Sequence, residues 1–224
     1  MKFIILVMLL LLSTTYSQNV KFIEVTGTAN IDYPADQIDW TVSLRKIADT
    51  FEESTNKCNA ALSNLLEILN LNGIDRNNIQ VSPLQQGRYY EQDYDRRNKV
   101  FKGFISSMVI NFTLKDMMKY SDLISTLSKS DEFENINSSY SDSKYEEHHK
   151  EAVIKASNEA KKKAMYLTEN FGKKLGSILE VEETNNSYPN PFNSSTSLQY
   201  ETPVTSGKVS YNRSVKIKFE IVEN

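Results

Sequence analysis

Hydrophobic and polar residues alternate in several separate stretches of the chain, which is the pattern of half-buried β-strands. The first such stretch runs from Lys21 to Tyr33, where Gly27 predicts a bulge or a close approach of another backbone. Pro34 lacks a backbone donor and predicts a turn, after which Ile38–Leu44 alternates cleanly. The folded part is therefore predicted to open with two consecutive strands joined by a Pro-Ala-Asp turn.

Three stretches change to a spacing of three or four between apolar residues, which predicts amphipathic helices. They are Phe51–Leu71, which stops at Asn72-Gly73, the shorter Asp116–Ser128, and Tyr145–Phe171. The predicted buried stripe of the last helix comprises Val153, Ala156, Ala160, Ala164, Leu167 and Phe171. Because three of these six residues are alanines, we expect this helix to lie close against its partner.

Period-two alternation returns between and after the helices. It predicts strands over Ile79–Leu84, Val100–Leu114, Phe133–Tyr140, Ile178–Val181 and Val209–Val222, with a ribbon tip at Asp93–Asn98. The resulting order, β-β-α-β-β-α-β-α-β-β, predicts an α+β fold with largely antiparallel sheets. We expect two long helices and one shorter helix to pack on one face, and residues 18–224 to form one domain that collapses into a single body.

The first 17 residues have the pattern of a secretory signal peptide. Lys2 precedes the apolar run Phe3–Leu12, and Thr15 and Ser17 occupy positions −3 and −1 of a cleavage site before Gln18. An uncleaved membrane anchor is disfavoured, because a transmembrane helix needs roughly 20 apolar residues. We therefore predict a periplasmic or secreted protein with no transmembrane segment after signal cleavage.

Charge and cysteine content bear on which partners the chain could bind and on whether it could hold a disulfide. Without Lys2 the chain carries 25 Lys and Arg against 29 Asp and Glu, a net charge of −4, which disfavours nucleic acid and anionic membranes as partners. Cys58 is the single cysteine, so an exported chain would hold no internal disulfide. It lies on an apolar helix stripe, which favours a buried, inert thiol over a redox-active or intermolecular one.

Candidate catalytic and metal-binding residues are few. His148 and His149 occupy adjacent helical positions and cannot chelate one ion together, although Glu147 and Glu151 could join His148. A solvated, charged helix start is the favoured interpretation. The sequence contains no G-x-S-x-G, P-loop, dinucleotide fingerprint or CxxC. We therefore predict no enzyme, no cofactor and no metal.

The tract from Arg88 to Arg97 interleaves tyrosines with arginines, as binders of single-stranded nucleic acid do. Its three acidic residues cancel its three arginines, so a solvated hairpin tip is favoured and a protein-contact surface is the alternative. The candidate contact residues are Arg88, Tyr89, Tyr90 and Tyr94 here, and Tyr188, Phe192 and Tyr200 in the polar segment before the last strand. A disordered connector would equally explain that later segment.

Four short motifs, in this order along the chain, together resemble the SIMPL domain family of bacterial periplasmic immunogenic and oxidative-stress-defence proteins. They are Val25-Thr26-Gly27-Thr28-Ala29 with Tyr33-Pro34-Ala35-Asp36, Leu71-Asn72-Gly73-Ile74 with Ile79, Lys102-Gly103-Phe104, and Phe171-Gly172-Lys173-Lys174-Leu175-Gly176. The chain departs from the family pattern at Ala29, where a second glycine is common, and at Ala35, which separates the proline from its aspartate.

The resemblance implies an exported, self-associating α+β protein and supplies no catalytic residues. Family members are tied to oxidative-stress tolerance and the cell envelope, and animal relatives are kinase-binding adaptors. The leading hypothesis is a non-enzymatic envelope or periplasmic protein that forms a homo-oligomer or binds envelope proteins in oxidative-stress defence. The alternative is a protective protein that binds a small ligand or metal through Cys58 or the His148-His149 region. An unrecognised hydrolase is third.

Overall fold

The computed structural model describes residues 20–92, 98–183 and 207–223. The chain divides into two compact units, which we call the large unit (residues 30–151 and 187–212) and the small unit (residues 1–29, 152–186 and 213–224). Each unit has its own cluster of buried hydrophobic residues, so the expected single body is replaced by two separately packed cores. The signal peptide predicted for residues 1–17 lies outside the described residues.

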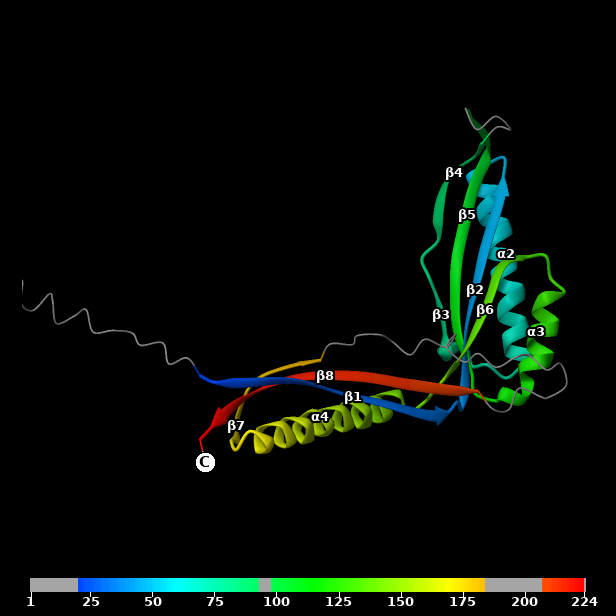
Figure 1. Cartoon of the computed structure of the whole chain (residues 1–224). Helices are drawn as coiled ribbons and strands as arrows, with labels where there is room; N and C mark the ends of the chain where they lie inside the picture. Colours follow the sequence, from blue (N-terminus) through cyan, green and yellow to red (C-terminus); the bar gives the residue numbers. More distant parts are fainter. Residues whose placement is uncertain (1–19, 93–97, 184–206, 224) are drawn as a thin grey trace, which may run out of the picture. The chain divides into compact units, whose positions relative to one another are not determined.

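The described residues form an α+β fold with antiparallel sheets, as predicted (Figure 1). The elements are β1 (Phe22–Pro34), β2 (Gln37–Ala48), α2 (Phe51–Leu71), the 3-10 turn η1 (Arg76–Asn78), β3 (Ile79–Val81), β4 (Gln85–Gln92), β5 (Lys99–Leu114), the 3-10 turn η2 (Met117–Lys119), α3 (Tyr120–Ser128), β6 (Phe133–Ser141), α4 (Tyr145–Asn170), β7 (Lys174–Glu183) and β8 (Lys208–Val222). The stretch predicted as one strand over Ile79–Leu84 is interrupted, because Pro83 has no backbone N–H with which to continue the ladder.

The large unit is built on a five-stranded sheet in the order β3-β5-β2-β6, with β4 pairing along β5 beyond β3. Its central strands β2 and β5 pair from Ile38↔Leu114 to Ala48↔Phe104. Helices α2 and α3 cover one face of this sheet (Figure 1). The helices therefore share one face here, whereas α4 packs on the other sheet of the molecule.

Alternating side chains of β2 face the helices and are almost fully buried. Ile38, Trp40, Val42 and Leu44 are each at most 2 % exposed. They pack with residues of β5, α2 and α3, and the Trp40 ring stacks on Phe112 with centroids 5.9 Å apart. Each such side chain contributes roughly 1.5–3 kcal/mol through the removal of apolar surface from water.

Helix α2 has the predicted bounds, and its two ends show why. Thr50 is the N-cap, and its side chain accepts a hydrogen bond from the Glu53 amide at 3.1 Å. At the other end Gly73 has φ 78°, and the Ile74 amide donates to the Leu69 carbonyl at 3.0 Å. A residue in the left-handed region closes the helix at low cost when it is glycine.

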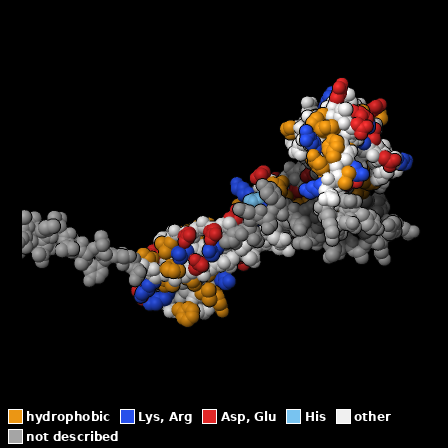
Figure 2. Space-filling view, turned by 90° about the horizontal axis from the view of Figure 1, so that it is seen from above, with side chains coloured by type: hydrophobic (Ala, Val, Ile, Leu, Met, Phe, Trp, Pro, Cys, Tyr) orange, Lys and Arg blue, Asp and Glu red, His pale blue; other side chains and the backbone are white. Residues whose placement is uncertain are grey.

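The small unit holds most of a three-stranded sheet in the order β1-β8-β7 with α4 packed against it (Figure 1). Residues 30–34 of β1, 145–151 of α4 and 208–212 of β8 belong to the large unit. Gly27 makes the close approach predicted for it. A Cβ placed there would lie 2.1 Å from the Ala156 carbonyl oxygen and 2.3 Å from the Ala160 nitrogen. The small residues on both sides thus let the backbones of β1 and α4 almost touch. Figure 2 shows hydrophobic side chains among charged ones on this unit's surface.

The predicted stripe of α4 is wrong at its end. Phe171 is 79 % exposed because α4 ends at Asn170, before that position. The buried positions instead recur every four residues, at Ala152, Ala156, Ala160, Ala164 and Thr168. Thr168 can take a buried place because its hydroxyl donates to the Ala164 carbonyl at 2.9 Å.

Candidate functional site

Three of the predicted contact residues lie on β4, at the outer part of the large unit's ribbon. Tyr94, Tyr188, Phe192 and Tyr200 lie outside the described residues. Arg88 is exposed and stands opposite Phe104 of β5. Tyr89 is half-buried beneath the guanidinium group of Arg45, which lies 4.9 Å from its ring centroid. The structure therefore places Tyr89 on one face of the ribbon, and Arg88 and Tyr90 on the other.

Arg45 is itself held in place by a carboxylate. Its Nη1 donates to Oε1 of Glu134 at 2.9 Å, and this hydrogen bond raises the pKa of Arg45 above its usual value. A guanidinium group fixed above a tyrosine ring gains a cation–π attraction as well. Tyr89 therefore serves an intramolecular contact between β4 and β2, and it is not a free contact residue.

Tyr90 belongs to an exposed group of aromatic rings, which we call the aromatic patch: Phe51, Tyr90, Phe101 and Phe104. Its ring centroid lies 5.6 Å from that of Phe101, Phe101 lies 5.4 Å from Phe104, and Phe104 lies 4.2 Å from Phe51. Phe51, Tyr90 and Phe101 are 41–48 % exposed. The sequence singled out only Tyr90 among these four.

A bulge in β5 places Phe101 and Phe104 on the same face. Residues three apart in a regular strand point to opposite faces. Here Tyr89 pairs with Gly103 and Tyr90 with Phe101, so Lys102 is an extra residue that pairs with no residue of β4. Gly103 has φ 131°, and a Cβ there would lie 2.5 Å from the Ala48 carbonyl oxygen. The Lys102-Gly103 pair is the sequence signal that could have revealed the patch.

The aromatic patch continues the helix-facing side of the sheet past the start of α2. Ser106, Met108 and Ile110 follow Phe104 on that side of β5 and are buried beneath the helices. Phe51 is the first residue of α2, so no further helical turn covers the sheet beyond it. The rings beyond that point are therefore packed on one another and remain open to solvent.

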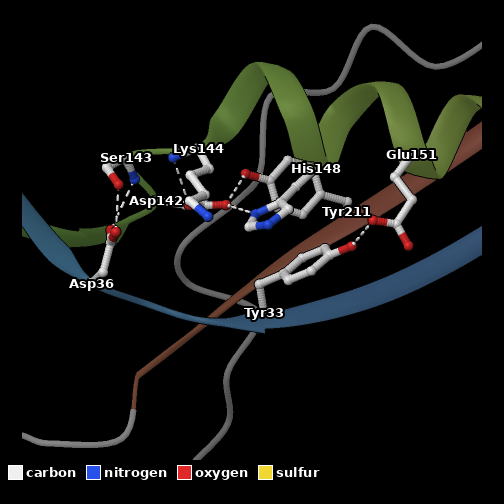
Figure 3. Close-up of polar contacts among 8 residues, drawn as sticks. All are labelled: Tyr33, Asp36, Asp142, Ser143, Lys144, His148, Glu151 and Tyr211. Atoms are coloured by element: carbon white, nitrogen blue, oxygen red, sulfur yellow. Dashed lines mark hydrogen bonds and ion pairs between the residues drawn. The ribbon is translucent and has the colours of Figure 1, made fainter.

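A second group of side chains surrounds Asp142, between the end of β6 and the start of α4 (Figure 3). Asp142 is 7 % exposed, and its Oδ1 accepts a hydrogen bond from the Lys144 amide at 2.8 Å. Its Oδ2 accepts one from the Tyr211 hydroxyl at 2.7 Å and lies within hydrogen-bonding distance of Nδ1 of His148. Burial acts to raise the pKa of Asp142, but the hydrogen bonds that it accepts outweigh burial and hold this pKa below its usual value.

Aromatic rings enclose the imidazole of His148. The ring of Tyr33 stacks on it with centroids 3.4 Å apart, and Tyr211 lies edge-on to both (Figure 3). The Tyr33 hydroxyl donates to Glu151 at 2.6 Å, which raises the pKa of Tyr33 to about 12. The side chain of His148 is only 16 % exposed, so the predicted solvated helix start is wrong for this residue.

A carboxylate beside an imidazole is the arrangement found in acid–base catalysis, but among the described residues no serine, threonine or cysteine is hydrogen-bonded to His148. The nearby Ser143 hydroxyl and amide both donate to Asp36, a different carboxylate from the one that holds His148. The group joins β1, α4 and β8 through polar contacts, as a helix cap with side-chain support does. Asp142, placed just before a predicted helix, carried a capping signal that sequence reasoning missed.

Cys58 is fully buried, and burial raises the pKa of its thiol, as for an inert core residue. Within the described residues there is no group of three His, Cys, Asp or Glu side chains that could hold a metal ion. Among the described helices, none is both long and apolar enough to cross a membrane.

Comparison with known proteins assigns the chain to a family from its sequence, and not from similarity to a solved structure. No curated protein matches it. A crystal structure of the regulatory subunit of aspartate kinase from Thermus flavus is similar over 88 % of this chain and 90 % of that one, at 11 % identity and a TM-score of 0.20, which supports no argument. The family described as "SIMPL: Protein of unknown function (DUF541)" matches residues 23–219. This chain therefore belongs to the SIMPL family.

Proposed function

We propose that this SIMPL-family chain is an exported, non-enzymatic protein of the periplasm or cell envelope that acts by binding other proteins, copies of itself included. The observation that carries the proposal is the aromatic patch. Three of its four rings are 41–48 % exposed, although every ring contacts another. Grouped aromatic side chains that remain open to solvent are typical of the energetic centres of protein interfaces.

The surroundings of the patch fit a binding surface. Its rings support one another, so little rotamer freedom remains to be lost when a partner covers them. Arg88 is exposed and stands opposite Phe104, so a charged side chain borders the rings on their own face of the ribbon. An apolar centre with a charged rim is the usual anatomy of a protein–protein interface.

The Asp142 group supports a non-enzymatic role. Both oxygens of Asp142 accept hydrogen bonds from within the protein, and the Ser143 hydroxyl is bound to Asp36. Catalysis by Ser143 would require its hydroxyl to leave Asp36 for a substrate. Export is supported by the N-terminal pattern of residues 1–17, and a role in oxidative-stress defence by what the family resemblance implies.

The test compares the chain with a Phe101→Ser variant, each purified from the compartment in which it accumulates. We expect Phe101→Ser to lose the co-purifying protein or the larger assembly that the unchanged chain shows in sedimentation. Leu71→Ser is the matched control, because Leu71 is 77 % exposed in the same unit but lies outside the patch. A strictly monomeric chain without partners, or identical assemblies in all three proteins, would contradict the proposal.

A further inference from the structure

Strand β7 exposes apolar side chains at the edge of the small unit's sheet. It pairs only with β8 among the described strands. Ile178, Leu179 and Val181 are 59, 44 and 58 % exposed. Edge strands in monomeric proteins are usually short or protected by charge, because their free backbone groups recruit other strands. A ten-residue edge with an apolar middle is therefore a candidate pairing surface.

The exposure arises because α4 does not cover β7. The alanines of α4 pack with residues of β1 and β8, including Val25, Val215 and Phe219. Ile178 and Val181 stand opposite Phe219 and Ile217, whose side chains are buried in the same core. Ile178 and Val181 thus lie on the face of the sheet that α4 packs against, but α4 does not cover them. A groove of about 670 Å³ runs between α4 and β7, lined by residues such as Met165, Leu175 and Ile178.

The charges along β7 determine which partner strand fits. Lys174 begins the strand, and Glu180, Glu182 and Glu183 end it. A second copy in parallel register would place glutamates beside glutamates, which is unfavourable. A second copy in antiparallel register would place the lysine end of each strand beside the glutamate end of the other. The strand is therefore self-complementary under a two-fold axis.

One antiparallel register also matches the faces of the side chains. With Ile178 opposite its own counterpart, Leu175 lies opposite Val181 on the groove side, and Lys174 lies opposite Glu182 on the other side. The pairing with β8 places these residues on those faces, since Leu175 and Val181 pair with Ile221 and Ile217, and Lys174 and Glu182 pair with Val222 and Lys216. The two irregularities of β7 fall on either side of Ile178, so both strands would bend alike.

We propose that two copies of this chain pair through β7, antiparallel and centred on Ile178, to form a continuous six-stranded sheet. This inference rests on the self-association in the proposed function and adds a second surface to it. It does not use the aromatic patch, which is in the other unit. A strand from a different protein or an apolar small molecule in the groove are the competing occupants.

Site-directed cross-linking tests the register. In a Cys58→Ser background, Ile178→Cys should form a disulfide-linked dimer under mild oxidation, because opposed residues in paired strands bring their Cβ atoms within about 5.5 Å. Thr26→Cys, on the opposite edge strand β1, is the control and should stay monomeric. Absence of the Ile178→Cys dimer, or equal cross-linking of both variants, would overturn the proposal.

Charge reversal tests the same pairing in solution. By sedimentation, Lys174→Glu should raise the dimer dissociation constant roughly tenfold, since each dimer contains the altered pair twice. Combining it with Glu182→Lys should restore the dimer. Circular dichroism confirms that each variant is folded. An unchanged chain that is monomeric at all concentrations, or a dimer whose dissociation constant is the same in both variants, would refute β7 pairing. If binding that depends on Phe101 persists in the Lys174→Glu variant, the proposed function still holds.

Discussion

The two units bury their cores in contrasting ways. The large unit fills the space between its sheet and two helices with bulky side chains such as Trp40, Leu65 and Ile110. The small unit brings a single helix against its sheet through Gly27 and a row of alanines. The first arrangement derives stability from filled volume, and the second from the close approach of two backbones.

The contrast predicts which kind of substitution destabilises each unit. Removing atoms from a core of large side chains leaves a cavity, whereas adding atoms to a core of small side chains forces the elements apart. One probe separates the two cases, because Trp40 is the only tryptophan of the chain and lies in the large unit. Its fluorescence therefore reports unfolding of the large unit, while far-UV circular dichroism reports both units.

The largest effect is expected from Leu65→Ala, which removes a fully buried side chain of α2. The lost burial and the cavity should lower the free energy of unfolding by about 2–5 kcal/mol. Urea unfolding followed by Trp40 fluorescence measures the change. Leu71→Ala on the same helix is the matched control: Leu71 is 77 % exposed, so its effect should stay within about 0.5 kcal/mol. Equal losses in both variants would show that the large unit does not depend on filled volume.

A smaller loss of about 1–3 kcal/mol is expected from Gly27→Ala. The added methyl group would overlap the Ala156 carbonyl and the Ala160 nitrogen, both of which are backbone and cannot rotate away. The loss should appear in circular dichroism with little change in the Trp40 transition. Gly87→Ala is the control, because a Cβ there meets only Ile105 at 3.6 Å. A Gly27→Ala variant as stable as the unchanged chain would disprove the close approach.

The smallest effect concerns Asp142, and it depends on pH. Because the pKa of Asp142 is lowered in the folded protein, its ionised form adds stability above the unfolded pKa near 3.9. That contribution is lost as the pH falls through the lower folded value. Asp142→Asn should therefore cost about 1–2 kcal/mol at pH 7 and progressively less below pH 4. A cost that stays constant between pH 7 and pH 3 would exclude the carboxylate as its source.

The bounds and buried faces of single helices and strands were predicted most reliably, because they depend on residues within the same element. The bounds of α2 follow from its stripe and from the glycine stop, and the alternation of β2 and β8 marks their buried faces. Phe171 was misassigned because its position continues the helical period after the helix has ended. The division into two cores was missed because an amphipathic stripe does not specify which sheet it covers.

The candidate site was predicted only in part, because its members come from distant positions. Tyr90 was identified, but Phe101 and Phe104 share its face only through the extra residue Lys102. Likewise, Asp142 meets Tyr211, which is 69 positions away, through the packing of β8 beside the start of α4. Contacts of this kind depend on sheet order, which alternation in one strand does not reveal.

The central place of β8 in the small sheet has a consequence for how the protein is made. β1 is synthesised first among the described strands and β8 last, yet β1 reaches β7 only through β8. The large unit's five-stranded sheet uses only residues that precede α4, so it can assemble while synthesis continues. β1 therefore stays unpaired within its sheet until β8 is synthesised and pairs with both β1 and β7.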